Sequence, residues 1–172
     1  MRGRLAGTRV ALVPLPPGLP AAIADWDAPR IARALDSLGL RAAYGWPHED
    51  TADAMSAPDP DGTFLVVLSD EVVGDCGWKA PPGQDGSVEI GYGLAASARG
   101  RGLGTEAVGV LAAWAEQQPG VRLVTAEVLP GNEPSLRLLS RLGFHEQGSH
   151  PPYLRLVRPA PGAPRVRGRH VC

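Results

Sequence analysis

The sequence has few of the features that mark secreted, membrane-spanning or nucleic-acid-binding proteins. Its two cysteines, Cys76 and Cys172, do not make the disulfide framework of a small secreted domain. No apolar run approaches the roughly 20 residues that span a bilayer. The formal net charge is −1 and Lys79 is the only lysine, so bulk electrostatics give no reason to expect a nucleic-acid partner.

The N-terminal stretch also lacks the uninterrupted apolar core of a signal peptide, because prolines break it at Pro14, Pro16, Pro17 and Pro20. With so little cysteine, we expect a cytoplasmic protein without a membrane segment. A chain of 172 residues suits one domain with a sizeable core.

One stretch, from Val88 to Gly104, combines a strand pattern with a glycine-rich loop. Its first half alternates, with Glu89 on one face and an apolar set on the other, namely Val88, Ile90, Tyr92 and Leu94. Its second half carries three glycines, which remove the Cβ atoms that would keep a ligand from the backbone, at Gly100, Gly102 and Gly104.

An apolar helical pattern follows this loop, so the first turn of a helix presents free N–H groups there. Such a turn binds phosphate, and Arg99 and Arg101 add cationic donors. A nucleotide P-loop would need G-K-[ST], and a dinucleotide loop would need G-x-G-x-x-G. The sequence has neither, since its glycines are spaced G-x-G-x-G.

What does fit is Arg99-x-x-Gly102-x-Gly104, which resembles the pyrophosphate loop of the GCN5-related N-acetyltransferases. A second motif of that family follows, an asparagine that opens a helix ending in Gly-Phe; here it runs from Asn132 to Phe144. The resemblance covers about Phe64 to Val157. The residues E-I-G-Y-G-L before the loop are most similar to the branch that contains ribosomal-protein and spermidine acetyltransferases.

This resemblance implies an α/β (α+β) fold over residues 1–158, with a mixed, mostly antiparallel central sheet flanked by helices. The fourth and fifth strands of that fold, here Val88–Leu94 and Leu123–Leu129, would splay apart around the pantetheine arm of the coenzyme. The residues after Arg158 have no apolar period and are expected to form a disordered basic tail, 159–172.

Periodicity predicts the other elements. Helices are expected in two short pieces within Ala21–Leu40, at Glu49–Met55, at Thr105–Gln118 and after Asn132. The remaining strands are expected at Arg9–Leu15, Phe64–Leu68, Val72–Trp78, Phe144–Gly148 and Tyr153–Val157.

The resemblance also implies acetyl-coenzyme A as the co-substrate, and the sequence predicts no metal site. Asn132 would cap its helix and contact the coenzyme as well. The residues expected to bind the coenzyme lie on the strand, the loop and the second motif: Tyr92, Leu94, Arg99, Gly100, Arg101, Gly102, Leu103, Gly104, Thr105, Asn132 and Ser135.

The implied reaction is attack of a primary amine on the thioester, and it needs groups that move protons. An alkylammonium has a pKa of about 10.4, so a proton has to leave. Glu89 and, second, Glu127 are the candidate bases. Family members often carry a tyrosine acid seven residues after the asparagine; here that residue is Leu139. Tyr153, Tyr92 or water are the alternative acids.

The acceptor is open between a small-molecule amine and a protein N-terminus. Either Trp46 is a packed residue and His48 lies at the surface, or both line the acceptor pocket. Four carboxylates, either solvated or attracting a cationic acceptor, lie nearby in the sequence: Asp25, Asp27, Glu49 and Asp50. A homodimer is also open. The alternative functions are a non-catalytic acyl-coenzyme A-binding module and, less favoured, a nucleotide-binding protein.

Overall fold

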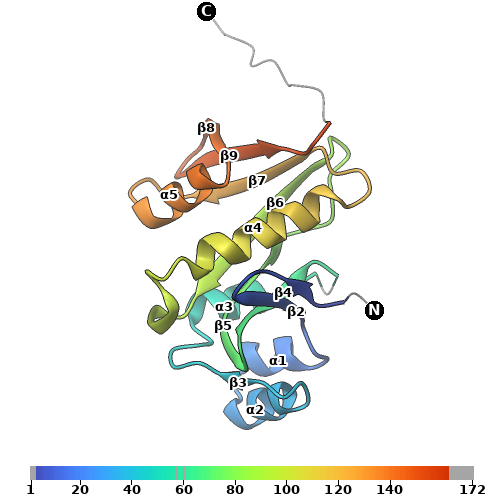
Figure 1. Cartoon of the computed structure of the whole chain (residues 1–172), viewed down its shortest axis with the longest axis vertical. Coiled ribbons are helices and arrows are strands. Elements are labelled where there is room, and N and C mark those ends of the chain that lie inside the picture. The colour runs from blue at the N-terminus through green and yellow to red at the C-terminus, as the bar shows by residue number, and fades with distance from the viewer. Residues whose placement is uncertain (1–2, 57, 60, 163–172) are drawn as a thin grey trace, which may run out of the picture.

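Over residues 3–56, 58–59 and 61–162, which a computed structural model describes, the chain forms one mixed sheet of nine strands (Figure 1). Along the main path the order is β1-β2-β4-β5-β6-β7-β9-β8, and β3 pairs with β5. The strands are β1 (Leu5–Ala6), β2 (Val10–Pro14), β3 (Arg41–Ala42), β4 (Thr63–Leu68), β5 (Glu71–Trp78), β6 (Ser87–Leu94), β7 (Leu123–Val128), β8 (His145–His150) and β9 (Tyr153–Pro159).

Helices cover both faces of this sheet (Figure 1). On one face α4 packs in the larger apolar core, which contains Phe64, Val88, Ile90 and Leu111. On the other face a second core joins the first three helices to Leu65 and neighbouring side chains of β4 and β5. The helices are α1 (Leu19–Ala24), α2 (Ala28–Asp36), α3 (Glu49–Met55), the short 3₁₀ turn η1 (Ala96–Ala98), α4 (Leu103–Glu116) and α5 (Glu133–Arg141).

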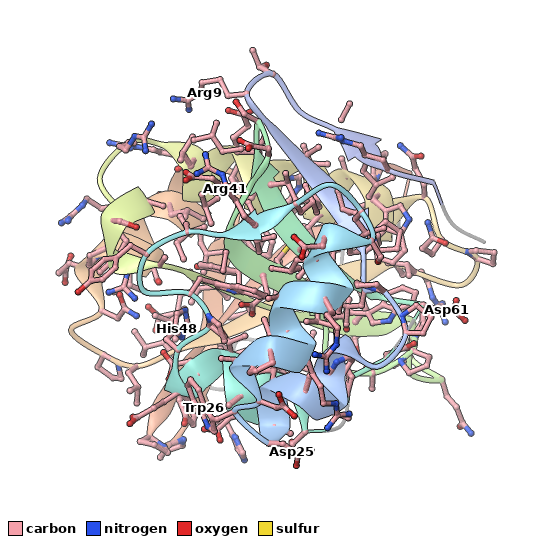
Figure 2. All side chains as sticks on the ribbon, turned by 90° about the horizontal axis from the view of Figure 1, so that it is seen from below. Arg9, Asp25, Trp26, Arg41, His48 and Asp61 are labelled. Atoms are coloured by element: carbon pink, nitrogen blue, oxygen red, sulfur yellow. The ribbon has the colours of Figure 1, made fainter. Side chains whose placement is uncertain are left out.

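The α/β (α+β) fold predicted from the sequence is confirmed. Strands β4, β5 and β6 are antiparallel neighbours, and α4 then crosses over to β7, which lies parallel to β6. A break at Asp27 separates α1 from α2, the two short helical pieces expected within Ala21–Leu40, and Asp27 caps α2 by accepting the Arg30 N–H at 3.0 Å. Trp26, beside this break, is 51% exposed at the outer edge of the helix layer (Figure 2).

Strands β6 and β7 separate after a short paired segment. They are in register over only three pairs, from Ser87 with Leu123 to Glu89 with Thr125. Beyond Glu89 the two strands diverge (Figure 1), while β6 stays paired with β5 as far as Leu94. The sheet therefore opens at the end of β6 that leads into the glycine-rich loop, which is the splay that the family resemblance implies.

The C-terminal boundary extends slightly beyond the expected one. Pro159 is still in β9, and the buried Ala160 donates its N–H to the Arg122 carbonyl at 3.0 Å. The predicted disordered tail over 159–172 stays a prediction for its last ten residues, because 163–172 lie outside the described residues. No helix in the described part is long and apolar enough to cross a membrane.

Candidate active site

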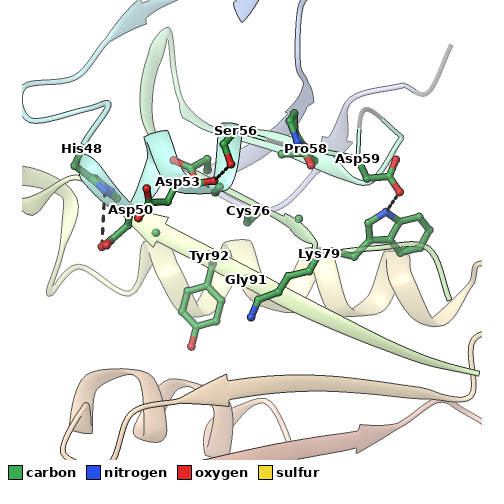
Figure 3. A pocket seen from close by; sticks show the side chains of 16 residues that line it. His48, Asp50, Asp53, Ser56, Pro58, Asp59, Cys76, Lys79, Gly91 and Tyr92 are labelled. Carbon is green, nitrogen blue, oxygen red and sulfur yellow. Dashed lines mark hydrogen bonds and ion pairs between the residues drawn. The ribbon is translucent and has the colours of Figure 1, made fainter. Parts of the chain in front are cut away.

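Two cavities formed by described residues meet at β6. The first, here called the loop cavity, has a volume of about 540 Å³ and lies between the glycine-rich loop and one face of α5. The second, the aspartate cavity, has a volume of about 420 Å³ and lies on the α3 side (Figure 3). Tyr92 and Gly93 belong to both linings. These two residues therefore form a wall that the two cavities share.

The loop wraps the N-terminus of α4 in a conformation that glycine permits. Gly100 and Gly102 have φ values of 72° and 76°, and Gly102 is the N-cap of α4. The N–H groups of the first turn are thereby presented at the positive end of the helix. Gly104 has another function: a Cβ there would meet Leu138 and Leu94 side-chain atoms at 3.2 and 3.3 Å. Its lack of a side chain lets α5 and β6 approach the loop.

Glu106 fixes the start of α4 to the neighbouring strand β2. Its carboxylate accepts the N–H groups of Arg9 and Val10 and pairs with the Arg9 guanidinium at 3.0 Å. Burial alone would raise the Glu106 pKa, but these hydrogen bonds outweigh it and the pKa is lowered. Arg9 also donates to the Arg101 carbonyl at 2.9 Å, so the loop is held from outside the cavity.

Cationic side chains surround the loop cavity. Arg99 lines it and donates its Nε–H to the Leu94 carbonyl at 2.9 Å. On α5, Arg137 and Arg141 line it four residues apart, on one face of the helix. Asn132 caps α5 by accepting the Ser135 N–H at 3.3 Å. The arrangement suits a ligand with several phosphate charges.

The free edge of β6 presents backbone groups to the opening between the strands. The backbone groups of Glu89 and Ala95 point toward β5. The Glu89 carbonyl accepts the Lys79 N–H at 2.8 Å, and the Ala95 N–H donates to the Val73 carbonyl at 2.9 Å. Backbone direction alternates along an antiparallel strand. The backbone groups of Tyr92 and Leu94 therefore face the other edge, where β7 has diverged. The Leu94 carbonyl is already bonded to Arg99, so the groups that an extended ligand can bond are those of Tyr92 and the Leu94 N–H.

Among the described residues, the aspartate cavity is lined by acidic side chains, and the loop cavity is not. His48 and Asp50 lie at one end of it, and Asp59 lies at the other end, where it accepts the Trp78 indole N–H at 2.8 Å (Figure 3). Asp53 and the buried Asp75 complete the carboxylates of its wall. Across β6, Lys79 adds a positive charge, but it is paired with Glu89.

Asp75 is the deepest of these carboxylates. It is 5% exposed, and its Oδ2 accepts the Trp46 indole N–H at 2.9 Å and the Thr51 hydroxyl at 2.8 Å. Burial raises the pKa of Asp75, and the two hydrogen bonds oppose that rise. Thr51 in turn lies next to His48, with its N–H 3.3 Å from His48 Nδ1.

Comparison with known proteins decides the family. A model of the acetyltransferase (GNAT) domain matches residues 9–145. The chain belongs to the GNAT acetyltransferase family. An uncharacterized N-acetyltransferase, p20 of Bacillus licheniformis, is 35% identical over half of this chain, and the match spans 48% of that protein.

Solved GNAT structures share the fold over almost the whole chain. An acetyltransferase of Agrobacterium tumefaciens has a TM-score of 0.66 at 23% identity, with 92% of this chain and 95% of that chain covered. The RimJ protein of Mycobacterium smegmatis, in complex with a coenzyme A disulfide, has a TM-score of 0.60 at 23% identity, with 94% and 87% covered. The family predicted from the two motifs is thus confirmed.

Most of the coenzyme-binding residues predicted from the GNAT motifs line the loop cavity: Tyr92, Leu94, Arg99, Gly100, Gly102, Gly104, Thr105, Asn132 and Ser135. Two do not. Leu103 is buried in the core, and Arg101 offers its carbonyl to Arg9. The roles of all these residues in coenzyme binding stay predictions. At Leu103 and Arg101 the backbone, not the side chain, would make the contact.

The predicted catalytic residues are more scattered. Glu89 lies outside both linings and forms an ion pair with Lys79. Glu127 lies on β7 with His150 Nδ1 3.7 Å from its Oε1, and Tyr153 begins β9, also outside both linings. No arrangement of described residues groups three metal-ligating side chains. The roles of Glu89, Glu127 and Tyr153 stay predictions.

Leu139 occupies the position where the resemblance would place a tyrosine acid, and Tyr92 is one of the alternative acids named from the sequence. Leu139 is fully buried in the core and offers no acid. Tyr92 lines both cavities, and burial raises its pKa, an effect that the nearby Ser135 hydroxyl partly offsets. A tyrosine with a raised pKa stays protonated at neutral pH, so Tyr92 has a proton to give.

Sequence reasoning missed several residues of this site. Arg137 and Arg141 carry a signal that was available, since two arginines four residues apart on the α5 helix share a face. Asp53, Asp59 and Asp75 carry no such signal, because they come from a helix, a loop and a strand that only the fold brings together.

Proposed function

We propose that this protein transfers the acetyl group of acetyl-coenzyme A to a primary amine that carries positive charge. The observation that carries the proposal is the wall of Tyr92 and Gly93, shared by a cation-lined cavity and an acid-lined cavity. Acetyl transfer needs such an arrangement, because the reacting carbon belongs to a molecule in one cavity and is attacked from the other.

The loop cavity supports the coenzyme half of the proposal. Coenzyme A carries a diphosphate, and the first turn of α4 with Arg99 offers donors for it. Its pantetheine arm is an extended chain with amide groups, which matches the backbone groups that Tyr92 and Leu94 present in the opening beside β6. The thioester would then reach the shared wall.

The aspartate cavity supports the acceptor half. A volume of about 420 Å³ suits a small molecule or the end of a peptide. Asp50, Asp53 and Asp59 line it, and its one lysine is engaged by Glu89. Carboxylates attract an ammonium group, and they favour acceptors with a second positive charge.

The proposed reaction has a simple proton balance. The acceptor ammonium loses one proton before attack, and the nitrogen loses a second after it has bonded to the acetyl carbon. The thiolate that leaves takes up one proton, for which Tyr92 is the nearest candidate on the shared wall. Glu89 is proposed as the base. Gly93 is the fourth residue after Glu89 along β6, or about 13 Å away, so Glu89 would act through water.

The test is calorimetry followed by an amine screen. Acetyl-coenzyme A, desulfo-coenzyme A and ATP are titrated at one salt concentration; we expect both coenzyme forms to bind and ATP not to bind. Thiol release is then measured with a monoamine, a polyamine, an aminoglycoside and a peptide with a free N-terminus. We expect the multiply charged amines to react fastest, and the preference to shrink as salt is raised.

The alternative, a non-catalytic acyl-coenzyme A-binding module, is favoured by one observation, the leucine at position 139. Tight binding of acetyl-coenzyme A without thiol release from any amine would establish that alternative. Binding of ATP alone would remove both readings and leave a nucleotide-binding protein.

A further inference from the structure

His48 is held at the N-terminus of α3 by its own ring. It is the N-cap residue, in an extended backbone conformation, and its Nδ1 accepts the Thr51 N–H at 3.3 Å. A backbone N–H can only donate, so Nδ1 must present its lone pair. In the neutral imidazole the hydrogen therefore belongs to Nε2, a tautomer assigned from this hydrogen bond.

The Nε2–H group has no acceptor among the described residues. The atom is buried from solvent, although His48 as a whole lines the aspartate cavity. It lies over the bare face of Gly93, where a Cβ would be 3.3 Å from Nε2 and 3.0 Å from Cε1. A buried donor without a partner is costly in a folded protein, and such groups are often reserved for a ligand.

The position of this donor coincides with the wall shared by the two cavities. Gly93 lines both, and the acetyl carbon has to be at that wall if it is to be reached from the aspartate cavity. Two other polar side chains lie there. Lys79 is paired with Glu89, whereas the buried Tyr92 hydroxyl also has no hydrogen-bond partner among the described residues. Unlike the His48 ring, which lies over Gly93, Tyr92 is the proposed proton donor to the thiolate.

We infer that His48 is a catalytic residue whose Nε2–H donates a hydrogen bond to the carbonyl oxygen of the acetyl thioester. The inference rests on the proposed function. When the amine nitrogen bonds to the acetyl carbon, the C=O electron pair moves to the oxygen, and the hydrogen bond strengthens as negative charge develops. When the pair returns, the C–S bond breaks and the thiolate leaves with its electrons. No proton leaves His48 in either step.

Three residues position the imidazole. Thr51 is fully buried and donates its hydroxyl to Asp75, which also accepts the Trp46 indole N–H. Asp75 is the registered partner of Gly93 across β5 and β6. The first turn of α3 is therefore anchored to the strand position opposite the glycine that His48 covers.

This geometry argues against His48 as the base that deprotonates the amine. In the assigned tautomer Nε2 has no lone pair to accept a proton, and Nδ1 is directed at Thr51. The charged group nearest to the ring is Asp50, whose Oδ2 is 4.0 Å from Nδ1 and whose side chain is 91% exposed. Loss of a base would change the pH profile of turnover, whereas loss of a carbonyl donor would change the carbonyl band of the bound thioester.

The test is infrared spectroscopy of acetyl-coenzyme A labelled with ¹³C at the carbonyl, bound to wild type and to His48→Asn. Asparagine is a strong N-cap and keeps α3, but its amide is too short to reach Gly93. We expect the carbonyl band to be shifted to lower frequency in wild type and to move back in the variant. We also expect kcat to fall roughly 10²-fold, with the KM for acetyl-coenzyme A changed less than about threefold.

The matched control is His145→Asn, the same substitution at an exposed histidine of β8, which is expected to behave as wild type. Calorimetry with coenzyme A separates the two hypotheses. If neither coenzyme form binds to wild type, the proposed function fails. If both bind and His48→Asn leaves the carbonyl band and kcat unchanged, only the role of His48 is overturned.

A second measurement needs no variant, in case His48→Asn does not fold. In ¹⁵N-labelled wild type, the His48 ring is expected as the Nε2–H tautomer, with its Nε2–H proton moving downfield on addition of acetyl-coenzyme A but not of coenzyme A. An Nδ1–H tautomer, or the same response to both ligands, would contradict the assignment.

Discussion

Asp75 and Gly93 face each other across β5 and β6, and together they place the first turn of α3. Directly opposed residues of an antiparallel pair point to the same face of the sheet. The carboxylate of Asp75 holds Thr51, and the missing side chain of Gly93 leaves room for the ring of His48. One bonded residue and one empty position thus fix where the imidazole lies.

Gly93→Ala tests this relationship directly. The added Cβ would be 3.0 Å from His48 Cε1, closer than such contacts normally are, so the ring has to move. We expect turnover to fall at least tenfold. In the His48→Asn background the same substitution should cost much less, because the ring is already gone. Equal losses in both backgrounds would show that Gly93 acts through the substrate alone.

Glu89 is tested together with the lysine that it binds. Glu89→Gln removes the proposed base and should lower turnover by roughly tenfold or more, with the affinity for coenzyme A unchanged. Lys79→Met removes the other half of the ion pair and leaves the carboxylate in place. If the two variants lose the same activity over the whole pH range, the pair is structural and Glu89 is not the base.

Gly102 is expected to be essential for coenzyme binding. Its φ of 76° is a left-handed conformation that costs a residue with a side chain about 1–2 kcal/mol, and a Cβ there would also meet Arg9 at 3.3 Å. Gly102→Val should therefore lower stability and abolish binding. Gly39→Val is the control, since Gly39 has a φ of 67° at the end of α2, far from the loop in the sequence. It should lower stability but leave calorimetric binding unchanged.

Arg137 and Arg141 are predicted to bind phosphate groups of the coenzyme. Both line the loop cavity and are exposed, so we expect Arg137→Gln and Arg141→Gln each to weaken binding by about three- to tenfold at low salt. The loss should shrink as salt is raised. Arg33→Gln, at an exposed position of α2, is the control. If one substitution weakens the binding of coenzyme A but not that of 3′-dephospho-coenzyme A, the arginine that it replaces contacts the 3′-phosphate.

The sequence predicted the coenzyme side of this protein better than the acceptor side, and the reason is physical. Gly100, Gly102 and Asn132 act through local backbone geometry, which residue types at fixed spacing determine. The strands around them followed from period-two patterns, whereas the mostly antiparallel sheet was implied by the family resemblance.

The aspartate cavity was not predictable in the same way. Asp53 is on α3 and Asp59 is in a loop. Asp75 is on β5, between the uncharged residues Gly74 and Cys76. In the sequence each of them is an ordinary polar residue. Even His48, which stood out, gave no sign that its Nδ1 would be occupied by Thr51, because that contact depends on where α3 begins.

Asp75 should make stability depend on pH in a direction opposite to that of most carboxylates. Its pKa is raised by burial, so between the unfolded value of about 3.9 and the higher native value the folded state binds more protons than the unfolded state. The contribution of Asp75 to the free energy of unfolding is therefore fully present below about pH 3.9 and decreases as the pH rises through the native pKa.

Asp75→Asn removes this titration while its oxygen can still accept from Trp46 and Thr51. Urea unfolding of both proteins from pH 4 to pH 8 measures the effect, and other titrating groups cancel in the difference. We expect the free energy of unfolding of wild type, relative to that of the variant, to fall as the pH rises. The variant should therefore be most stable relative to wild type at pH 8. A difference that is constant over this range, or that grows with pH, would mean that Asp75 keeps its charge when it is buried.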